Sequence, residues 1–449
     1  MGKTNSQESI MINFVLYSIM PFLFILGFCI TIHEFGHFLL AKIFGIPVEK
    51  FSIGYGPPLV RMKIGETDFR IAYFPLGGYV KMAGEDEGKI LKHDKEPLPK
   101  PETQAPPEGQ LGFYDAPIYK RIIVVLAGPM FNLFSAFIVL FFIFVIYGLI
   151  ITPYMRVQIV KGSYYENSGL VNGDSIIALD GTPVSYWEEL LDHADNREEI
   201  IVTALRDGEV VNIAVFFEAE STGLRPLIPP LIANLKQNGP ADKAGMKKGD
   251  LVLRIDDQQM HTWYEMVEIV RQTRDIPLVF EWQHGDEERL AEITPTTIYD
   301  PVAEDTIGQI GVFMPHSRKY LSIINAIGLA IERTVEMTYR MLDIFYQLIT
   351  HQIPTNQIGG PIAIFKLSAE SAHWGFEHLL GLLTIISINL GIINLFPIPA
   401  LDGGHILIGT IEAIRRKRFS KKTILIMQQI GYALILLLIL FVTFNDITR

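Results

Sequence analysis

Residues 12–41 read INFVLYSIMPFLFILGFCITIHEFGHFLLA, an apolar run whose only charged residue is Glu34. A helix needs about 20 apolar residues to cross roughly 30 Å of bilayer hydrocarbon. Comparable runs occupy 122–151, 379–401 and 424–444. Buried helices of a large soluble core are the alternative, but such long apolar runs are unusual in them. A cleaved signal peptide does not fit, because the first run is too long and lacks a small-residue cleavage site. The sequence therefore predicts a polytopic α-helical membrane protein with about four transmembrane helices.

The composition divides the chain into an apolar frame and an acidic middle region. The 449 residues combine a hydrophobic share of 49% and a mean hydropathy of +0.28 with a net charge of -11. Residues 152–318 hold 28 acidic and 14 basic side chains, whereas the remainder holds 21 and 24. The acidic region argues against binding to nucleic acid, because it repels phosphate. The single cysteine, Cys29, excludes a disulfide framework.

Basic residues between the spans predict the orientation of the chain, because cytoplasmic connections carry an excess of Lys and Arg. Six of the eight residues in 415–422 are basic, and 42–121 is also rich in Lys and Arg. Four spans then place both termini and 152–318 on the opposite, extracytoplasmic side of the membrane. The Pro-, Lys- and Glu-rich stretch 89–110, within a cytoplasmic loop at 83–121, predicts a mobile segment.

Residues 319–351 repeat apolar side chains at helical spacing but are not predicted to form a transmembrane helix. Five charges interrupt this pattern, and they are too costly for the bilayer interior. The charged residues are Glu332, Arg333, Glu336, Arg340 and Asp343. An interfacial amphipathic helix is the preferred interpretation, and a helix packed on the soluble region is the alternative.

The acidic region contains an internal repeat. Residues 168–190 and 244–266 match at an offset of 76, including Trp187 and Trp263. Each copy has a glycine-rich turn ending in Gly-Asp, then a strand, a turn and a helix. This pattern resembles PDZ-like α+β domains, expected at 152–221 and 222–312, which take extended peptides or C-termini by strand addition. A spacer role without a ligand is the alternative. The expected PDZ ligand loops contain Gly169, Gly173, Asp174, Gly245, Gly249 and Asp250.

The ionisable residues of the first span form the motif His33-Glu34-Phe35-Gly36-His37. Histidines four residues apart share one helical face and can bind one metal ion, which leaves Glu34 to act on a water molecule. An ionisable group in a membrane helix costs about 2.5–3.5 kcal/mol on insertion scales, so a compensating metal is expected. A structural histidine pair is the alternative.

A catalytic zinc site needs a third protein ligand and keeps one position for water. Asp402 is the preferred candidate, since it follows an apolar helix that Pro397 and Pro399 interrupt. His405 competes with it, but a carboxylate beside two histidines is the donor set of known hydrolytic sites. The sequence therefore predicts Zn2+ held by His33, His37 and Asp402.

Taken together, these motifs resemble the site-2 protease family of intramembrane zinc metalloproteases. The resemblance rests on H-E-x-x-H in the first span, N-x-x-P-x-P-x-L-D-G at 394–403, and the PDZ repeats between them. The stretches 51–56, 77–82 and Ala127-Gly128-Pro129 with Asn132 extend it over nearly the whole chain. It implies regulated intramembrane proteolysis in a stress response, with cleavage of a single-span anti-sigma factor after another protease has removed its outer domain. Clearance of remnant signal peptides is also implied, as is a location in the inner membrane of a bacterium with both termini and the PDZ repeats on the periplasmic side.

The resemblance further implies roles for individual residues. Glu34 would be the catalytic residue, and 51–82 a membrane-associated β-hairpin that aligns the substrate. Alternating apolar residues and glycine pairs support strands there, and an exposed strand edge can hold an unwound substrate. Asn394 would hold substrate backbone or the developing oxyanion, with a helix-breaking cap as the alternative. The expected substrate-binding residues are Asn394, Gly54, Tyr55, Gly77, Gly78 and Tyr79.

The predicted organisation places 1–151 and 376–449 as the two halves of a membrane catalytic core, in contact with membrane lipid. Two other classes of function remain open. A secondary transporter also uses broken helices and polar residues in the membrane, but it needs pseudo-symmetric halves and each motif occurs once. A non-enzymatic sensor would combine PDZ peptide binding with a structural metal site, which four ligands close.

Overall fold

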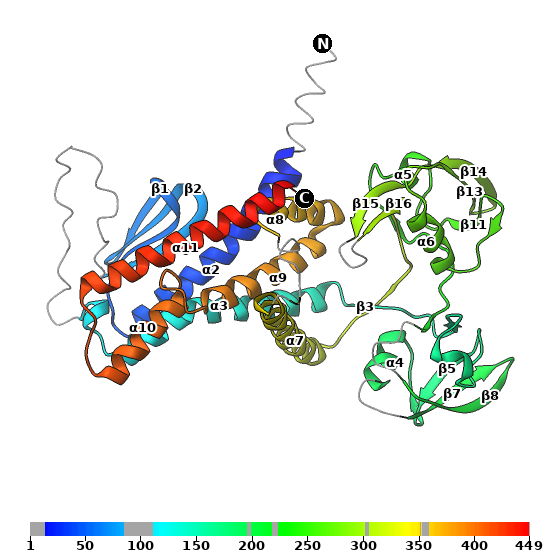
Figure 1. Ribbon diagram of the computed structural model, residues 1–449, viewed down its shortest axis with the longest axis horizontal. Coiled ribbons are helices and arrows are strands. Elements are labelled where there is room, and N and C mark those ends of the chain that lie inside the picture. The colour runs from blue at the N-terminus through cyan, green and yellow to red at the C-terminus, as the bar shows by residue number, and fades with distance from the viewer. Residues whose placement is uncertain are drawn as a thin grey trace, which may run out of the picture. The chain divides into compact units, whose positions relative to one another are not determined.

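The computed structural model describes residues 14–84, 111–194, 199–217, 223–300, 305–350, 352 and 359–448. The chain forms two compact units, drawn in Figure 1. One is Gly148–Tyr320, and the other combines Met1–Tyr147 with Leu321–Arg449. The predicted mobile segment at 89–110 lies outside the described residues.

In the described part of the chain, four helical stretches are long and apolar enough to cross a membrane. This agrees with the predicted polytopic protein of about four spans. The stretches are Val15–Ile43, Ile118–Ile146, Phe376–Asn394 and Lys422–Thr448. The corresponding elements are η1 (Val15–Ile19) with α2 (Met20–Ile43), α3 (Ile118–Ile146), α9 (Phe376–Asn394) and α11 (Lys421–Thr448).

Two of these helices end before the predicted boundaries. Helix α9 stops at Asn394 rather than at 401, because Pro397 and Pro399 lack the N–H groups that a continued helix requires. Helix α3 stops at Ile146 rather than at 151. Gly148 follows it with a φ of +77°, a left-handed conformation that commonly terminates helices.

Helix α3 is the centre of the membrane unit, where it packs against α2, α7 (Ile323–Ile349), α9 and α10 (Asp402–Arg415). Small residues bring the backbones together. A Cβ atom on Gly36 of α2 would lie 2.6 Å from the carbonyl oxygen of Ala127, and one on Gly391 of α9 would lie 3.1 Å from that of Pro129. Close crossings of this kind let membrane helices gain van der Waals contact where lipid offers no hydrophobic driving force.

Between α2 and α3 lies a long antiparallel hairpin of β1 (Val48–Ile64) and β2 (Thr67–Met82), which includes the predicted 51–82. Its root is anchored on α2, where the ring of Phe38 lies 5.5 Å from those of Phe51 and Phe69. Its tip exposes apolar side chains such as Leu59 and Val60. The anchored root places the end of β2 beside α2. A short 3-10 helix, η2 (Phe113–Asp115), precedes α3.

Three further helices complete this unit: α7 (Ile323–Ile349), α8 (Pro361–Trp374) and α10 (Asp402–Arg415). Helix α7 falls within the predicted 319–351 and packs on α3 and α9. Sequence analysis did not anticipate α8. Its first turn is capped by Asp446 near the end of α11, whose carboxylate accepts hydrogen bonds from the backbone N–H groups of Gly360, Ile362 and Ala363.

The second unit contains two four-stranded sheets with the same strand order, as expected for a duplication. The first sheet, β6-β5-β7-β8, packs with α4 (Trp187–Ala194), and the second, β12-β11-β13-β14, with α6 (Trp263–Gln272). Each has its own core, centred on Trp187 in one copy and on Trp263 and Trp282 in the other. These are the two PDZ-like α+β domains. Their strands are β5 (Ser175–Leu179), β6 (Thr182–Pro183), β7 (Ile200–Arg206), β8 (Glu209–Val215), β11 (Leu251–Ile255), β12 (Gln258–Gln259), β13 (Leu278–His284) and β14 (Glu287–Ile293).

Short strand pairs complete the unit and join its two ends. Strand β3 (Leu149–Ile151), where the chain enters, pairs with β18 (Ser317–Lys319), where it leaves. An insertion whose ends lie together leaves the flanking chain undisturbed. The remaining elements are β4 (Val157–Ile159), η3 (Tyr164–Asn167), β9 (Leu224–Pro226), β10 (Asn234–Leu235), α5 (Pro240–Lys243), β15 (Thr296–Asp300), β16 (Asp305–Gln309) and β17 (Val312–Phe313).

Candidate metal centre

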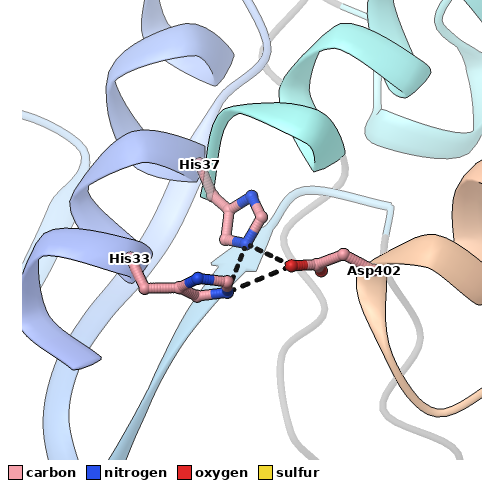
Figure 2. A group of neighbouring side chains, drawn as sticks. All are labelled: His33, His37 and Asp402. Atoms are coloured by element: carbon pink, nitrogen blue, oxygen red, sulfur yellow. Dashed lines mark hydrogen bonds and ion pairs between the residues drawn. The ribbon is translucent and has the colours of Figure 1, made fainter. Parts of the chain in front are cut away.

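Three ligand atoms converge between α2 and the start of α10 (Figure 2). The Nε2 atoms of His33 and His37 lie 3.2 Å apart. Oδ2 of Asp402 lies 3.1 Å from Nε2 of His33 and 3.5 Å from Nε2 of His37. The two rings share one face of α2 because four residues complete about one helical turn. The fold thus unites the two motifs that lie furthest apart in the chain.

The cluster fits a zinc ion. Ligand atoms bound tetrahedrally at about 2.0–2.1 Å lie roughly 3.3 Å from one another, close to the separations of 3.1, 3.2 and 3.5 Å found here. Oδ2 of Asp402 is buried, and apart from the two histidine Nε2 atoms it has no hydrogen-bond partner among the described residues. A cation would satisfy this oxygen, since buried carboxylates require a compensating partner.

Two glycines place Asp402 at the cluster. A Cβ atom on Gly403 would lie 2.1 Å from the carbonyl oxygen of Leu395, and one on Gly404 would lie 2.2 Å from that of Ile398. Only glycine permits the loop after α9 to fold this tightly against α10. His405, the competing candidate, lines the same cavity but is not part of the three-residue cluster.

Helix α3 encloses the two histidines from the other side. Nδ1 of His37 lies 2.9 Å from the carbonyl oxygen of Val124. Nδ1 of His33 lies 3.3 Å from Nδ2 of Asn132 and 3.4 Å from Nδ2 of Asn394. Sequence analysis assigned no role to Val124 or Asn132. The Ala127-Gly128-Pro129 stretch indicated that this part of α3 is important, but its sequence does not show which helix packs against it.

The cluster opens into a cavity of about 380 Å³ that Glu34 also lines. Val80, near the end of β2, lines the cavity beside Glu34. Of the residues expected to bind substrate, all but one line this cavity: Asn394, Tyr55, Gly77, Gly78 and Tyr79. The exception is Gly54, which lies within β1 where the pairing with β2 is irregular. Its φ is +91°, and a Cβ atom there would lie 2.6 Å from the carbonyl oxygen of Phe74, so its role is in the path of the strand.

The predicted PDZ loop residues lie in the other unit and make contacts within their own domains. Asp174 accepts a hydrogen bond from the N–H of Val171 and pairs with Arg206, which lowers the pKa of the Asp174 carboxyl. In the second copy, Asp250 accepts from the N–H of Lys247 and pairs with His284. These contacts stabilise the glycine turns, and a ligand at these loops stays a prediction.

A metal-binding H-E-x-x-H helix inside a bundle of membrane helices defines a membrane-embedded metalloprotease. The chain belongs to peptidase family M50, whose family model matches residues 21–438. It is a zinc metalloprotease and a multi-pass membrane protein. The predicted resemblance to the site-2 proteases is thereby confirmed.

Two relatives match the chain almost end to end. The regulator of sigma-E protease RseP of Escherichia coli is 31% identical over 463 residues, covering 97% of this chain and 99% of that protein. The zinc metalloprotease RasP of Geobacillus kaustophilus is 30% identical, covering 97% and 98%. A solved PDZ domain of an SdrC-like protein from Listeria monocytogenes matches 19% of this chain at 22% identity, with a TM-score of 0.17 that is too low to support a conclusion.

Proposed function

We propose that this protein is an intramembrane zinc endopeptidase that hydrolyses a peptide bond within the transmembrane segment of a single-span membrane protein. The observation that carries the proposal is the convergence of His33, His37 and Asp402, with Glu34 on the same cavity, among helices apolar enough to span a membrane. A structural metal site would be closed by four ligands. The described His, Cys, Asp and Glu residues supply three.

The proposed chemistry divides between the metal ligands and Glu34. His33, His37 and Asp402 would hold zinc. When bound, zinc acts as a Lewis acid that can make water nucleophilic near neutral pH. Glu34 then accepts a proton from the attacking water and delivers it to the leaving amine nitrogen. Glu34 lines the cavity together with the three proposed ligands. Asn394 lines the same cavity and would stabilise the developing oxyanion.

The end of β2 is the proposed site for substrate backbone. Phe51 of β1 pairs with Val80 on one side and with Phe69 on the other, so residues 78–82 form an edge of the hairpin sheet. Gly77, Gly78 and Tyr79 of this edge line the cavity. A helical substrate shields its peptide bonds, so it must unwind, and an unpaired edge can then hold it extended.

The proposed substrate is an anti-sigma factor type of membrane protein from which another protease has removed the outer domain, with remnant signal peptides as a second group. The near full-length match to a regulator of sigma-E protease supports this. The two PDZ-like domains would act as a size filter on the periplasmic side, and the metal centre would lie toward the cytoplasm. The basic residues of 415–422 support this orientation.

The proposal is tested by comparing purified wild type with Glu34→Gln for zinc content and for cleavage of a membrane-embedded single-span substrate. Loss of general acid–base catalysis should lower the rate by at least about 10²-fold while the zinc content stays unchanged. Cleavage by Glu34→Gln at the wild-type rate would refute the role of Glu34. A wild type that binds no zinc would refute the metal centre.

A further inference from the structure

Asn132 is the most completely buried polar side chain beside the metal centre. It lies in α3, has an exposed fraction of 0%, and places Nδ2 3.3 Å from Nδ1 of His33. Its Oδ1 atom is buried and has no hydrogen-bond partner among the described residues. A buried amide oxygen left without a donor is costly, so this side chain calls for a functional explanation.

The two histidines have different neighbours at Nδ1. An imidazole that binds a metal through Nε2 carries its proton on Nδ1 and needs a hydrogen-bond acceptor there. His37 has such an acceptor in the carbonyl oxygen of Val124, 2.9 Å from its Nδ1. Among the residues that the structure describes, Nδ1 of His33 has two side-chain amides at this distance, those of Asn132 and Asn394. Because a half-turn exchanges the oxygen and nitrogen of an amide without changing its shape, either residue could supply the acceptor.

The surroundings of the two amides distinguish them. Asn394 is the last residue of α9, is half-buried and lines the cavity, so substrate can reach it. Asn132 lies within α3, and its backbone carbonyl oxygen accepts hydrogen bonds of 2.9 Å from the hydroxyls of both Ser135 and Ser387. The Asn132 side chain is fully buried and is not among the residues that line the cavity, so substrate does not reach it.

We propose that Asn132 is a positioning residue whose amide oxygen accepts the Nδ1 proton of His33 and so keeps Nε2 free to bind zinc. Asn394 then remains available to the substrate. The inference rests on the proposed metal centre and assigns separate tasks to the two asparagines that approach His33.

The test is the zinc affinity of the full-length protein, measured by competition with a chelator of known affinity. Asn132→Leu keeps the size of the side chain but removes the acceptor, and we expect its affinity to fall by about 10–100-fold. Asn132→Asp keeps an acceptor oxygen in the same place, and we expect it to remain within about threefold of wild type. Ser368→Ala, which removes a fully buried hydroxyl of α8 that donates to the carbonyl oxygen of Ile364 in the same helix, serves as the matched control and should bind zinc like wild type.

Several outcomes would overturn the inference. Wild-type affinity in Asn132→Leu would show that His33 needs no acceptor from this residue, and equal losses in the Leu and Asp variants would show that packing or the amide donor matters instead. If Asn132→Leu does not fold, Asn132→Ala takes its place with the same expectation. Asn394→Leu should lower cleavage but keep zinc affinity, and a zinc loss there matching that of Asn132→Leu would contradict the division of tasks. A wild type that binds no zinc would instead refute the proposed function.

Discussion

Gly128 sets the space available to both histidine rings. A Cβ atom at this position would lie 2.4 Å from Nε2 of His37 and 2.8 Å from Cε1 of His33. Because these atoms belong to rigid rings in a packed core, Gly128→Ala must displace the rings of His33 and His37. We expect at least about a tenfold loss of zinc affinity, measured by chelator competition.

Gly27→Ala provides the control for this substitution. Gly27 lies in the same membrane unit, on α2, and a Cβ atom there meets nothing within 4 Å. This variant should therefore bind zinc like wild type. Unchanged zinc affinity in Gly128→Ala would mean that the two helices separate easily and that the site is less rigid than its packing indicates.

The metal centre shows which parts of a site can be predicted from local sequence. His33 and His37 were predictable because their spacing alone places them on one helical face. Asp402 was predictable because a carboxylate after two prolines is unusual in an apolar region. The contacts of Val124 and Asn132 with the histidines were not, because they depend on where α3 crosses α2. No spacing within either helix encodes that crossing.

At the scale of elements, a buried ion pair fixes α10, which carries Asp402, to α3. Arg121 lies 2.8 Å from Oε2 of Glu412, and Glu412 is only 2% exposed. Arg121→Met would leave this carboxylate buried without its partner, which costs about 3–5 kcal/mol. We expect a clearly lower midpoint of thermal unfolding in detergent.

The double variant Arg121→Met/Glu412→Leu tests the cause of that loss. Removing both charges should recover much of the stability, because a buried pair can often be replaced by apolar residues of similar size. Recovery will be incomplete, since Glu412 also accepts the backbone N–H of Phe419. A single variant as stable as wild type would show that Glu412 is reached by water.

In the PDZ-like unit, the ion pair between Asp174 and Arg206 predicts a pH dependence of stability. The hydrogen bond from Arg206 lowers the pKa of Asp174 in the folded state. The ion pair therefore adds its full share to the free energy of unfolding above the unfolded-state pKa of Asp, about 3.9. This stabilisation is lost as the pH falls further, through the folded-state pKa of Asp174. Arg206→Met should lower stability at pH 7 and reduce the loss of stability below about pH 4.

This prediction is measured by urea unfolding of the fragment Gly148–Tyr320, which has its own cores and should fold alone. Arg289→Met is the matched control, because Arg289 pairs with Glu287 on the surface, where ion pairs contribute little. Equal effects of the two substitutions at pH 7 would contradict a special role for Asp174.

Elements were predictable where their own residues carry the signal. The duplication was visible because Trp187 and Trp263 keep their spacing from the Gly-Asp turns. Helix α8 was missed because Lys366 and Glu370 interrupt its apolar pattern, and because its N-terminus is capped by Asp446 from the far end of the chain. A cap supplied from another helix leaves no mark in the local sequence.

At the scale of the whole molecule, the uneven charge corresponds to an inserted unit. The acidic stretch 152–318 nearly coincides with the unit Gly148–Tyr320, whose two ends are paired through β3 and β18. Because these ends lie together, residues 152–316 can be replaced by a short Gly-Ser linker without separating the membrane helices on either side.

This deletion tests the proposed size filter. If the PDZ-like domains exclude substrates with a bulky periplasmic domain, the deletion variant should cleave an intact precursor that wild type rejects. Immunoblotting of a tagged precursor in reconstituted vesicles measures this directly. Cleavage of an already truncated substrate is the control for the remaining activity. Continued rejection of the intact precursor by a variant that passes this control would argue against the filter.

The central claim is that the metal centre hydrolyses a peptide bond inside the membrane. Mass spectrometry of the products from a single-span substrate, reconstituted in lipid vesicles with zinc-loaded protein, tests it most directly. We predict one pair of fragments whose new ends lie within the substrate's transmembrane segment, formed by wild type and absent with Glu34→Gln. New ends only outside that segment, or the same fragments with Glu34→Gln, would contradict the account.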